Sequence, residues 1–377
     1  MAILPELCSI QYGYAFDSAC FTEDSTYFPL VRIRDVKRGY SETFYSGIHP
    51  NDYIIDNGSL LVGMDGEFNI ARWKGGKALL NQRVCKITAR NNVDEEYLRF
   101  ALTKALKEIE NRTSFVTVKH LSAKELNRIE IDIPDYRVQI SISGTLTKIE
   151  NIIFTRQQQL QKLDELVKAR FVELFGNPVI NNKGWNVSDL GQLTIKIGSG
   201  ATPKGGKEAY QTDGISLIRS MNVHNGKFEY KELAHISDEQ AARLENVAVE
   251  ENDVLLNITG ASVARSCVVP TNVLPARVNQ HVCIIRCKDS IMPDFINSLL
   301  IDDNYQDLLW SIAGSGATRE AITKQQVESL QIILPPISKQ EEFSKFINRV
   351  DKSKVAVQKS LDEAQLLFDS LMQQYFG

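Results

Sequence analysis

The sequence predicts an α+β protein, in which two similar mixed α/β modules are separated by two long antiparallel coiled-coil helices with pseudo-twofold symmetry. Three observations predict it: an internal repeat, two long segments with a coiled-coil pattern, and short apolar segments between polar, glycine-containing loops. We assign the first module to residues 1–137, the first helix to 138–176, the second module to 177–335 and the second helix to 336–377.

The internal repeat is the strongest feature of the sequence. HLSAKELNRIEIDIP (120–134) aligns with AITKQQVESLQIILP (321–335) at an offset of 201, which holds for about 57 positions and pairs Gln139 with Gln340. Upstream, with small gaps, 29–40 resembles 216–228, 58–66 resembles 252–260, and 81–87 resembles 279–285. An old gene duplication without functional meaning would leave the same pattern. A duplicated binding module, however, forms a pseudo-dimer in one chain, which suits a target in two parts.

Each long segment carries a stripe of apolar residues that recur at alternating steps of four and three, as in a coiled coil. In the first helix Arg156 and Arg170 occupy two of the stripe positions, and the others are Ile142, Leu146, Ile149, Ile153, Leu160, Leu163, Val167 and Leu174. In the second helix Lys354 is the polar exception, and the others are Phe343, Ile347, Val350, Val357, Leu361, Ala364, Phe368, Leu371 and Tyr375. A helix of this length spans roughly 55 Å. Since one amphipathic helix cannot bury its stripe alone, we expect the two stripes to pack together in antiparallel orientation.

Each module is expected to contain many short strands, such as FPLVRI and RVCKIT in the first and DVLLNI and HVCIIRC in the second. Helices are expected near 94–110 and 293–312. Polar loops between the strands are where recognition residues commonly lie.

Composition and charge limit the class of protein. Of the 377 residues, 43% are hydrophobic and 24% are charged, and no stretch is apolar enough for a membrane helix. The N-terminus lacks the pattern of a secretory signal, and the six cysteines form no C-x-x-C pair, so we expect reduced, buried thiols, no metal site and a cytoplasmic location. The net charge of −4 argues against DNA binding by charge alone. A DNA-binding face would need locally concentrated basic residues, or phosphate contacts supplied by a partner.

Motifs for catalysis are missing from the sequence. We find no amide-Pro-Pro-aromatic motif of a DNA methyltransferase and no G-x-G-x-x-G after a predicted strand. The segment GSGATPKGGKE resembles a phosphate-binding loop, but Ala201 stands where that motif needs glycine and Glu208 where it needs Ser or Thr. The five histidines form no pattern with a nucleophile. We therefore expect no catalytic residue, cofactor or metal in this chain.

The order module–helix–module–helix resembles the specificity subunits of Type I restriction–modification systems. The residues that carry the resemblance are the strand-to-helix joints ELNRIEIDIPDYRVQ and VESLQIILPPISKQEEF, the helix ends VKARFVELFGNP and LFDSLMQQYFG, and the pair NQRVCKI and NQHVCII. The resemblance covers essentially the whole chain, although Asp135-Tyr136 departs from the usual pattern of the first joint.

The resemblance implies that each module is a target-recognition domain for one half of a bipartite site in double-stranded DNA. The helices would set the spacing of the halves and dock two modification (methyltransferase) subunits. Those partners would bring S-adenosylmethionine, and restriction subunits that use ATP and Mg²⁺ could join later. The chain itself would be non-catalytic.

Recognition of bases in the major groove uses Arg, Lys, Asn, Gln, Ser and Thr side chains. From the first module we select as candidate DNA contacts Arg32, Arg34, Lys37, Arg38, Asn69, Arg72, Lys74 and Lys119. From the second module we select Lys204, Lys207, Arg219, Asn222, His224, Arg265 and Arg319. For each of them the alternative is an ordinary surface side chain.

Two other functions stay open at this point. A coiled-coil scaffold that binds no DNA suits the net charge, and a nuclease or methyltransferase with an unfamiliar site is the second alternative.

Overall fold

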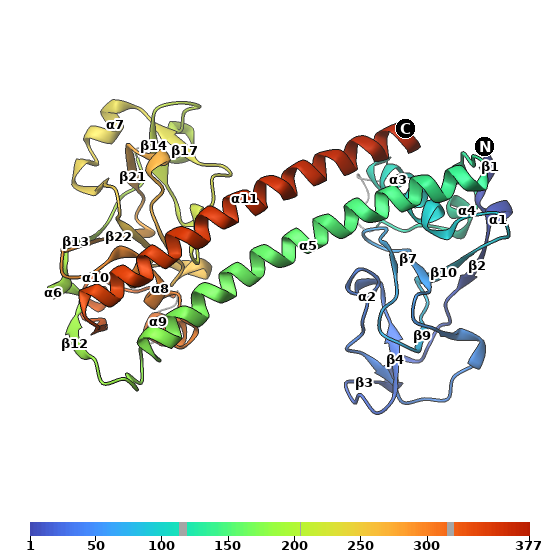
Figure 1. Cartoon of the computed structure of the whole chain (residues 1–377), viewed down its shortest axis with the longest axis horizontal. Helices are drawn as coiled ribbons and strands as arrows, with labels where there is room; N and C mark the ends of the chain where they lie inside the picture. The colour runs from blue at the N-terminus through green and yellow to red at the C-terminus, as the bar shows by residue number, and fades with distance from the viewer. Residues whose placement is uncertain (113–118, 204, 315–319) are drawn as a thin grey trace. The chain divides into compact units, whose positions relative to one another are not determined.

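The computed structural model describes residues 1–112, 119–203, 205–314 and 320–377, and the side chains of Lys207 and Ala209 lie outside this description. The chain divides into two compact units. Unit 1 comprises residues 1–157 and 359–377, and unit 2 comprises residues 158–358. Each unit therefore holds one module together with part of each long helix (Figure 1).

The module of unit 1 is built from two main sheets and α3 (Glu95–Arg112). The first sheet is antiparallel and has the order β2 (Cys8–Tyr12), β10 (Val84–Ala89), β7 (Leu60–Gly63), β8 (Ile70–Arg72). The second has the order β3 (Phe21–Thr22), β5 (Phe44–Tyr45), β4 (Phe28–Val31), β9 (Ala78–Leu80), β6 (Ile54–Ile55), in which β4 and β9 are parallel. The remaining elements are β1 (Ala2–Ile3), paired with β11 (Glu130–Ile131), and the short helices α1 (Leu4–Leu7), α2 (Ile33–Arg38) and α4 (Ala123–Leu126).

The module of unit 2 repeats this plan. Its first sheet has the order β13 (Thr194–Ser199), β22 (Val282–Cys287), β19 (Val254–Asn257), β20 (Ser266–Val268), and its second β17 (Ala234–Ile236), β14 (Ile215–Ile218), β21 (Ala276–Val278), β18 (Ala248–Val249). Small pairs are β12 (Asn186–Asp189) with β23 (Gln331–Leu334) and β15 (Val223–His224) with β16 (Lys227–Phe228). The helices are α6 (Leu190–Leu193), α7 (Asp238–Ala242), α8 (Pro293–Leu300), α9 (Asp303–Gly314) and α10 (Lys324–Glu328).

The predicted duplication is confirmed by this topology. The order β2-β10-β7-β8 corresponds to β13-β22-β19-β20, and the parallel pair β4–β9 corresponds to β14–β21. The helix expected over 94–110 is confirmed as α3, whereas the segment near 293–312 forms two helices, because the chain turns between Leu300 and Asp303.

The central strands are buried on both faces, which explains their uninterrupted apolar sequences. In β7, Leu60 and Val62 face the core that contains α3, while Leu61 faces the core between the two sheets. In β19, Val254 and Leu256 likewise face the core that contains the helices, while Leu255 faces the core between the two sheets. Since successive strand residues point to opposite faces, each module has three layers: a helical layer, the first sheet and the second sheet.

The two long helices are α5 (Tyr136–Phe175) and α11 (Ile337–Phe376), each of 40 residues. Within unit 1 they run antiparallel, since Leu146 packs with Met372 while Arg156 Nε donates to Ser360 Oγ at 3.1 Å. Every residue of the predicted stripes is buried or partly buried. The coiled-coil prediction is therefore confirmed.

Within unit 2 the helices are also antiparallel. The Lys354 ammonium lies 2.6 Å from the Asp164 carboxylate, and the rings of Phe171 and Phe343 are 5.7 Å apart. Phe175 at the end of α5 lies in the core of unit 2, and its repeat partner Phe376 at the end of α11 packs against that of unit 1. Each helix thus ends in a module core, which is the arrangement that a duplication at constant offset produces.

Among the described residues, no helix has a stretch both long and apolar enough to cross a lipid bilayer.

Candidate nucleic-acid interface

The short helix α2 presents basic side chains from the first module. It begins after Arg32, whose backbone N–H donates to Asp35 Oδ2 at 2.9 Å, and Asp35 has no exposed area. Val36 is buried between the sheets, and Gly39 ends the helix in the left-handed conformation at φ 79°. The apolar face of α2 is thereby fixed. The candidate residues on its other positions, all exposed, are Arg32, Arg34, Lys37 and Arg38.

Two of these arginines line an open hollow of about 710 Å³ beside α2. Arg34 donates to Thr43 Oγ1 at 3.1 Å, which fixes the direction of its guanidinium, while Arg32 forms no ion pair with any described residue. Arg38 is paired with Glu42 at 3.2 Å. The hollow is also lined by Phe21 and Phe44 and by Glu23 and Glu42, so it combines basic, acidic and aromatic side chains.

The repeat partners Arg219 and Asn222 use the same backbone design in the second module. Asn222 Oδ1 accepts from the Arg219 backbone N–H at 3.0 Å, as Asp35 does for Arg32. The Asn222 side chain has no exposed area, and its amide donates to the Glu229 carbonyl at 2.9 Å. The structure therefore corrects our expectation for Asn222, since it supports the backbone here and presents no group to DNA.

Arg219 is only partly exposed. Its guanidinium lies over the ring of Tyr210, 5.3 Å from the centroid, and donates to the backbone carbonyl of Glu232. These contacts hold the side chain in one direction.

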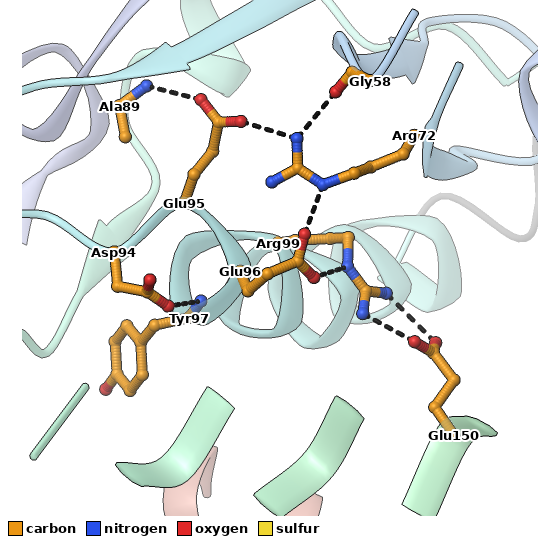
Figure 2. A network of polar contacts seen from close by, with 9 residues as sticks. All are labelled: Gly58, Arg72, Ala89, Asp94, Glu95, Glu96, Tyr97, Arg99 and Glu150. Carbon is orange, nitrogen blue, oxygen red and sulfur yellow. Dashed lines mark hydrogen bonds and ion pairs between the residues drawn. The ribbon is translucent and has the colours of Figure 1, made fainter. Parts of the chain in front are cut away.

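Arg72 lies in a network of ion pairs inside the first module (Figure 2). It pairs with Glu95 at 2.7 Å and with Glu96, both at the start of α3. Glu96 also binds Arg99 at 2.6 Å, and Arg99 forms two hydrogen bonds with Glu150 of α5, at 3.1 and 2.7 Å. Arg72 thus connects β8 to α3, and Arg99 connects α3 to the long helix. The structure gives Arg72 an internal role.

The carboxylate of Glu96 is stabilised by this network. Burial raises the pKa of Glu96, but the hydrogen bonds and charges of Arg99 and Arg72 outweigh it, so that the pKa lies below the ordinary value of a glutamate. The group is therefore ionised at neutral pH.

Three further candidates of the first module lie outside α2 and this network. Asn69 is partly buried in the loop between β7 and β8. Lys74 is exposed, with its ammonium 5.9 Å from the centroid of the Phe154 ring. Lys119 pairs with Glu110 at 3.3 Å.

In the second module, His224 and Arg265 are partly exposed, and Arg265 forms no ion pair or side-chain hydrogen bond with a described residue. Lys204 and Arg319 lie outside the described residues, as does the side chain of Lys207. Among the described candidates, Arg32 and Arg34 line one hollow, and as DNA contacts all of the candidates stay predictions.

A cluster that the sequence reasoning missed lies where the β7–β8 loop meets two other segments. The carboxylate of Asp65 contacts His120 Nδ1, and it lies 3.4 Å from Arg83 Nε. In the second module Thr259 and His281 form the corresponding contact. The repeat alignment contained a sign of this cluster, because polar residues of different type stand at its equivalent positions. Asp65 aligns with Thr259, and Arg83 aligns with His281.

Near the start of each long helix, one buried glutamine fastens the helix to a module. Gln139 accepts from the Asp94 backbone N–H at 2.9 Å and donates to the Pro134 carbonyl at 2.8 Å. Its repeat partner Gln340 accepts from the Met292 backbone N–H at 2.9 Å and donates to the Pro335 carbonyl at 2.9 Å. The constant offset therefore preserves a structural joint.

Within the described part of the chain, we also looked for metal-binding side chains and for reactive thiols. No group of three or more His, Cys, Asp or Glu side chains there could hold a metal ion. All six cysteines are free, four of them buried, while Cys20 and Cys287 are partly buried. Burial raises the pKa of Cys85 and Cys283 to about 12, so these thiols are protonated at neutral pH.

Comparison with known proteins defines the class. A model of the Type I restriction modification DNA specificity domain matches residues 3–165 and 182–364, and the chain belongs to this family. The resemblance drawn from the sequence is thereby confirmed.

Two relatives show how far the likeness extends. The specificity subunit of the Type I restriction enzyme EcoBI from Escherichia coli is 26% identical over 400 residues, covering 98% of this chain and 83% of the relative. The specificity subunit of the Type I restriction enzyme MjaVIII from Methanocaldococcus jannaschii is 20% identical, covering 86% of this chain and 79% of the relative.

Solved structures agree on the fold. The S subunit of a Type I restriction–modification system from M. genitalium matches with a TM-score of 0.62 at 14% identity, covering 100% of this chain and 95% of that chain. A second solved structure, described as showing complex assembly and conformational transition of the type I R-M system, contains a chain that matches with a TM-score of 0.54 at 18% identity. The match covers 100% of this chain and 96% of that chain.

Proposed function

We propose that this chain is the DNA-reading subunit of a Type I restriction–modification complex and recognises a bipartite target, with one module for each half-site. The observation that carries the proposal is the duplicated module, whose first sheet has the same strand order in both copies, while several polar side chains on equivalent loops differ. A shared scaffold with different exposed groups suits two half-sites of different sequence, because base edges are distinguished by their hydrogen-bond patterns.

The same proposal assigns the long helices to partner binding. Several of their large apolar side chains are exposed to solvent: Ile152 and Phe154 at 47% and 55%, Leu166 at 47%, Val355 at 71%, and Leu366 and Leu367 at 73% and 49%. Exposed apolar surface marks a protein–protein contact site where it is contiguous. We assign them to the docking of two methyltransferase subunits.

Phosphate contacts are assigned in part to these partners, since the chain has a net charge of −4. A protein that binds DNA on its own commonly carries a concentrated basic surface. The partners would also supply S-adenosylmethionine, and restriction subunits that join the complex would supply ATP and Mg²⁺. The chain would act in the cytoplasm and would catalyse no step itself.

The test is to sequence methylated adenines in host DNA with and without this chain, and to measure DNA binding of the purified complex and of the chain alone at one salt concentration. We expect a bipartite methylated motif that disappears without the chain, and specific binding by the complex that is at least ten times tighter than for a scrambled site.

The alternatives predict other results. A scaffold that binds no DNA would leave the methylated motif unchanged and show no preference for the target over scrambled DNA. An enzyme would act on DNA as the purified chain alone, with Mg²⁺ or S-adenosylmethionine added.

A further inference from the structure

Both modules contain the same three-segment junction at one end of the first sheet. In unit 1 the Met64 N–H donates to the Arg83 carbonyl at 2.8 Å, and the Leu121 N–H donates to the Met64 carbonyl at 2.7 Å. In unit 2 the Ile258 N–H donates to the His281 carbonyl at 3.0 Å, and the Ile322 N–H donates to the Ile258 carbonyl at 2.8 Å. The junction therefore has one backbone frame in both copies.

A close approach of two glycines to the neighbouring turn is part of this frame. A Cβ atom on Gly13 would lie 2.0 Å from the Asn81 carbonyl oxygen, and one on Gly200 would lie 1.6 Å from the Val278 carbonyl oxygen. Only glycine fits at such distances. Asn81 and its repeat partner Asn279 are both buried. The buried residues of the junction are therefore the same in both modules.

The accessible side chains on this frame are only partly shared: Gln82 and its repeat partner Gln280 are both exposed, whereas Arg83 in unit 1 is replaced by His281 in unit 2. In unit 1, Asp65 holds His120 and Arg83, and the Arg83 side chain remains 51% exposed. An arginine positioned by a carboxylate keeps outward N–H donors, which can pair with the N7 and O6 atoms of guanine. Arg83 is also in the left-handed region, at φ 75°, which is unfavourable for a residue with a side chain.

In unit 2 the junction carries a chain of side-chain hydrogen bonds. Thr202 Oγ1 donates to Gln280 Oε1, and Gln280 Nε2 lies 3.0 Å from His281 Nε2. Because an amide nitrogen can only donate, His281 Nε2 accepts, and its Nδ1 carries the proton toward Thr259 Oγ1. Gln280 is exposed and retains one N–H and one oxygen lone pair, which match N7 and the N6 amino group of adenine.

We propose that these two junctions determine base specificity, with Arg83 recognising a guanine in one half-site and Gln280 an adenine in the other; this rests on the proposed function. Arginine and glutamine are the side chains that pair in a bidentate way with guanine and with adenine, respectively, in the major groove. Asp65 and His281 act as positioning residues that orient the reading groups.

The experiment is to sequence methylated adenines in cells whose complex carries a single variant of this chain. Arg83→Gln should relax one guanine position of one half-site by roughly 10- to 100-fold in discrimination and leave the other half-site unchanged. Gln280→Ala should relax one adenine position of the other half-site. Arg83→Gly should act like Arg83→Gln, and since glycine favours the left-handed conformation, it separates loss of reading from loss of folding.

Matched controls are Arg128→Gln and Gln325→Ala, which remove the same side-chain types at exposed positions of α4's C-terminal turn and α10. Both should leave the motif unchanged. If Arg83→Gln and Gln280→Ala also preserve every base of a bipartite motif, or weaken binding equally on all sequences, the inference is wrong while the proposed function stands. If the unaltered chain yields no bipartite motif, the proposed function itself fails.

Discussion

At the scale of single residues, the polar groups divide into those that build the frame and those available for recognition. Asp35 and Asn222 are buried and support the backbone of the arginine three residues earlier. Gln139 and Gln340 are equally buried and join module to helix. An unpaired polar group in such a place would cost free energy, so these side chains are constrained by folding rather than by the target.

Glu96 gives a residue-scale prediction that depends on pH. Its folded-state pKa is lowered, so its ionised form contributes stability above the ordinary pKa of about 4.5, and this contribution is lost as the pH falls through the lower folded-state value. We expect Glu96→Gln to reduce the free energy of unfolding by about 2 kcal/mol at pH 7 and by less near pH 4. Urea denaturation at both pH values measures the difference.

The matched control for this prediction is Glu67→Gln, because Glu67 is exposed and its side chain has no ion pair with a described residue. It should change the stability by less than about 0.5 kcal/mol at either pH. A Glu96→Gln effect that is constant from pH 7 to pH 4 would contradict the assignment to charge.

At the scale of elements, the long helices have two kinds of apolar residue. The stripe residues pack between helices or into a module core, as Leu146 and Phe171 do. Others lie off the stripe and are exposed, with Leu366 at 73%. The first kind stabilises the fold, and the second contributes little to it because it stays in contact with water.

Leu366→Lys tests the element-scale proposal that exposed apolar residues dock the methyltransferase. We expect the stability of the chain to change by less than about 0.5 kcal/mol, since the side chain is exposed. Association with the methyltransferase should weaken at least tenfold, because a charged group would be buried in an apolar contact. Isothermal titration calorimetry measures the affinity.

Gln365→Lys is the control, since it adds the same charge at an exposed neighbouring position about 100° around the helix. It should bind the partner nearly as the unaltered chain does. Equal loss in both variants would indicate a general charge effect, and no loss with Leu366→Lys would place docking elsewhere.

At the scale of the whole molecule, each compact unit contains parts of both long helices, and the division falls near Gln157 in α5 and near Gln358 in α11. If the helix pair sets the spacing of the half-sites, its length determines the number of base pairs between them. The identity of the bases would depend on the modules alone.

A paired insertion of one heptad after Gln157 and after Gln358 tests this idea. Seven residues keep the stripe in phase and lengthen each helix by roughly 10 Å, which corresponds to about 3 base pairs. We expect the methylated motif to keep both half-sites and to gain about three bases of spacer. Sequencing of methylated DNA measures the motif, and altered half-sites with an unchanged spacer would exclude the helices as the spacing element.

A paired insertion of seven residues elsewhere in the chain controls for added length. The loop at Gly75-Gly76 and the turn at Asn225-Gly226 are exposed or partly exposed, and they belong to different modules. Insertions there should leave the spacer unchanged.

The sequence by itself determined the duplication, the two long helices with their stripes, and the general layout of short strands. These features follow from the local periodicity of apolar residues and from the constant offset of the repeat. Both can be seen in the amino-acid sequence before the fold is known. It also led to the family, since the joints and helix ends carry the resemblance.

Only the tertiary structure decided which polar residues are accessible. The sequence predicts Asn222 and Arg219 equally well as surface residues. In the structure, however, Asn222 is buried and Arg219 is partly exposed, because burial depends on neighbours that are distant in the chain. The junction of Asp65, Arg83 and His120 likewise joins three segments separated along the sequence. Periodicity reports the face of an element, whereas the meeting of loops is set by how sheets and helices pack.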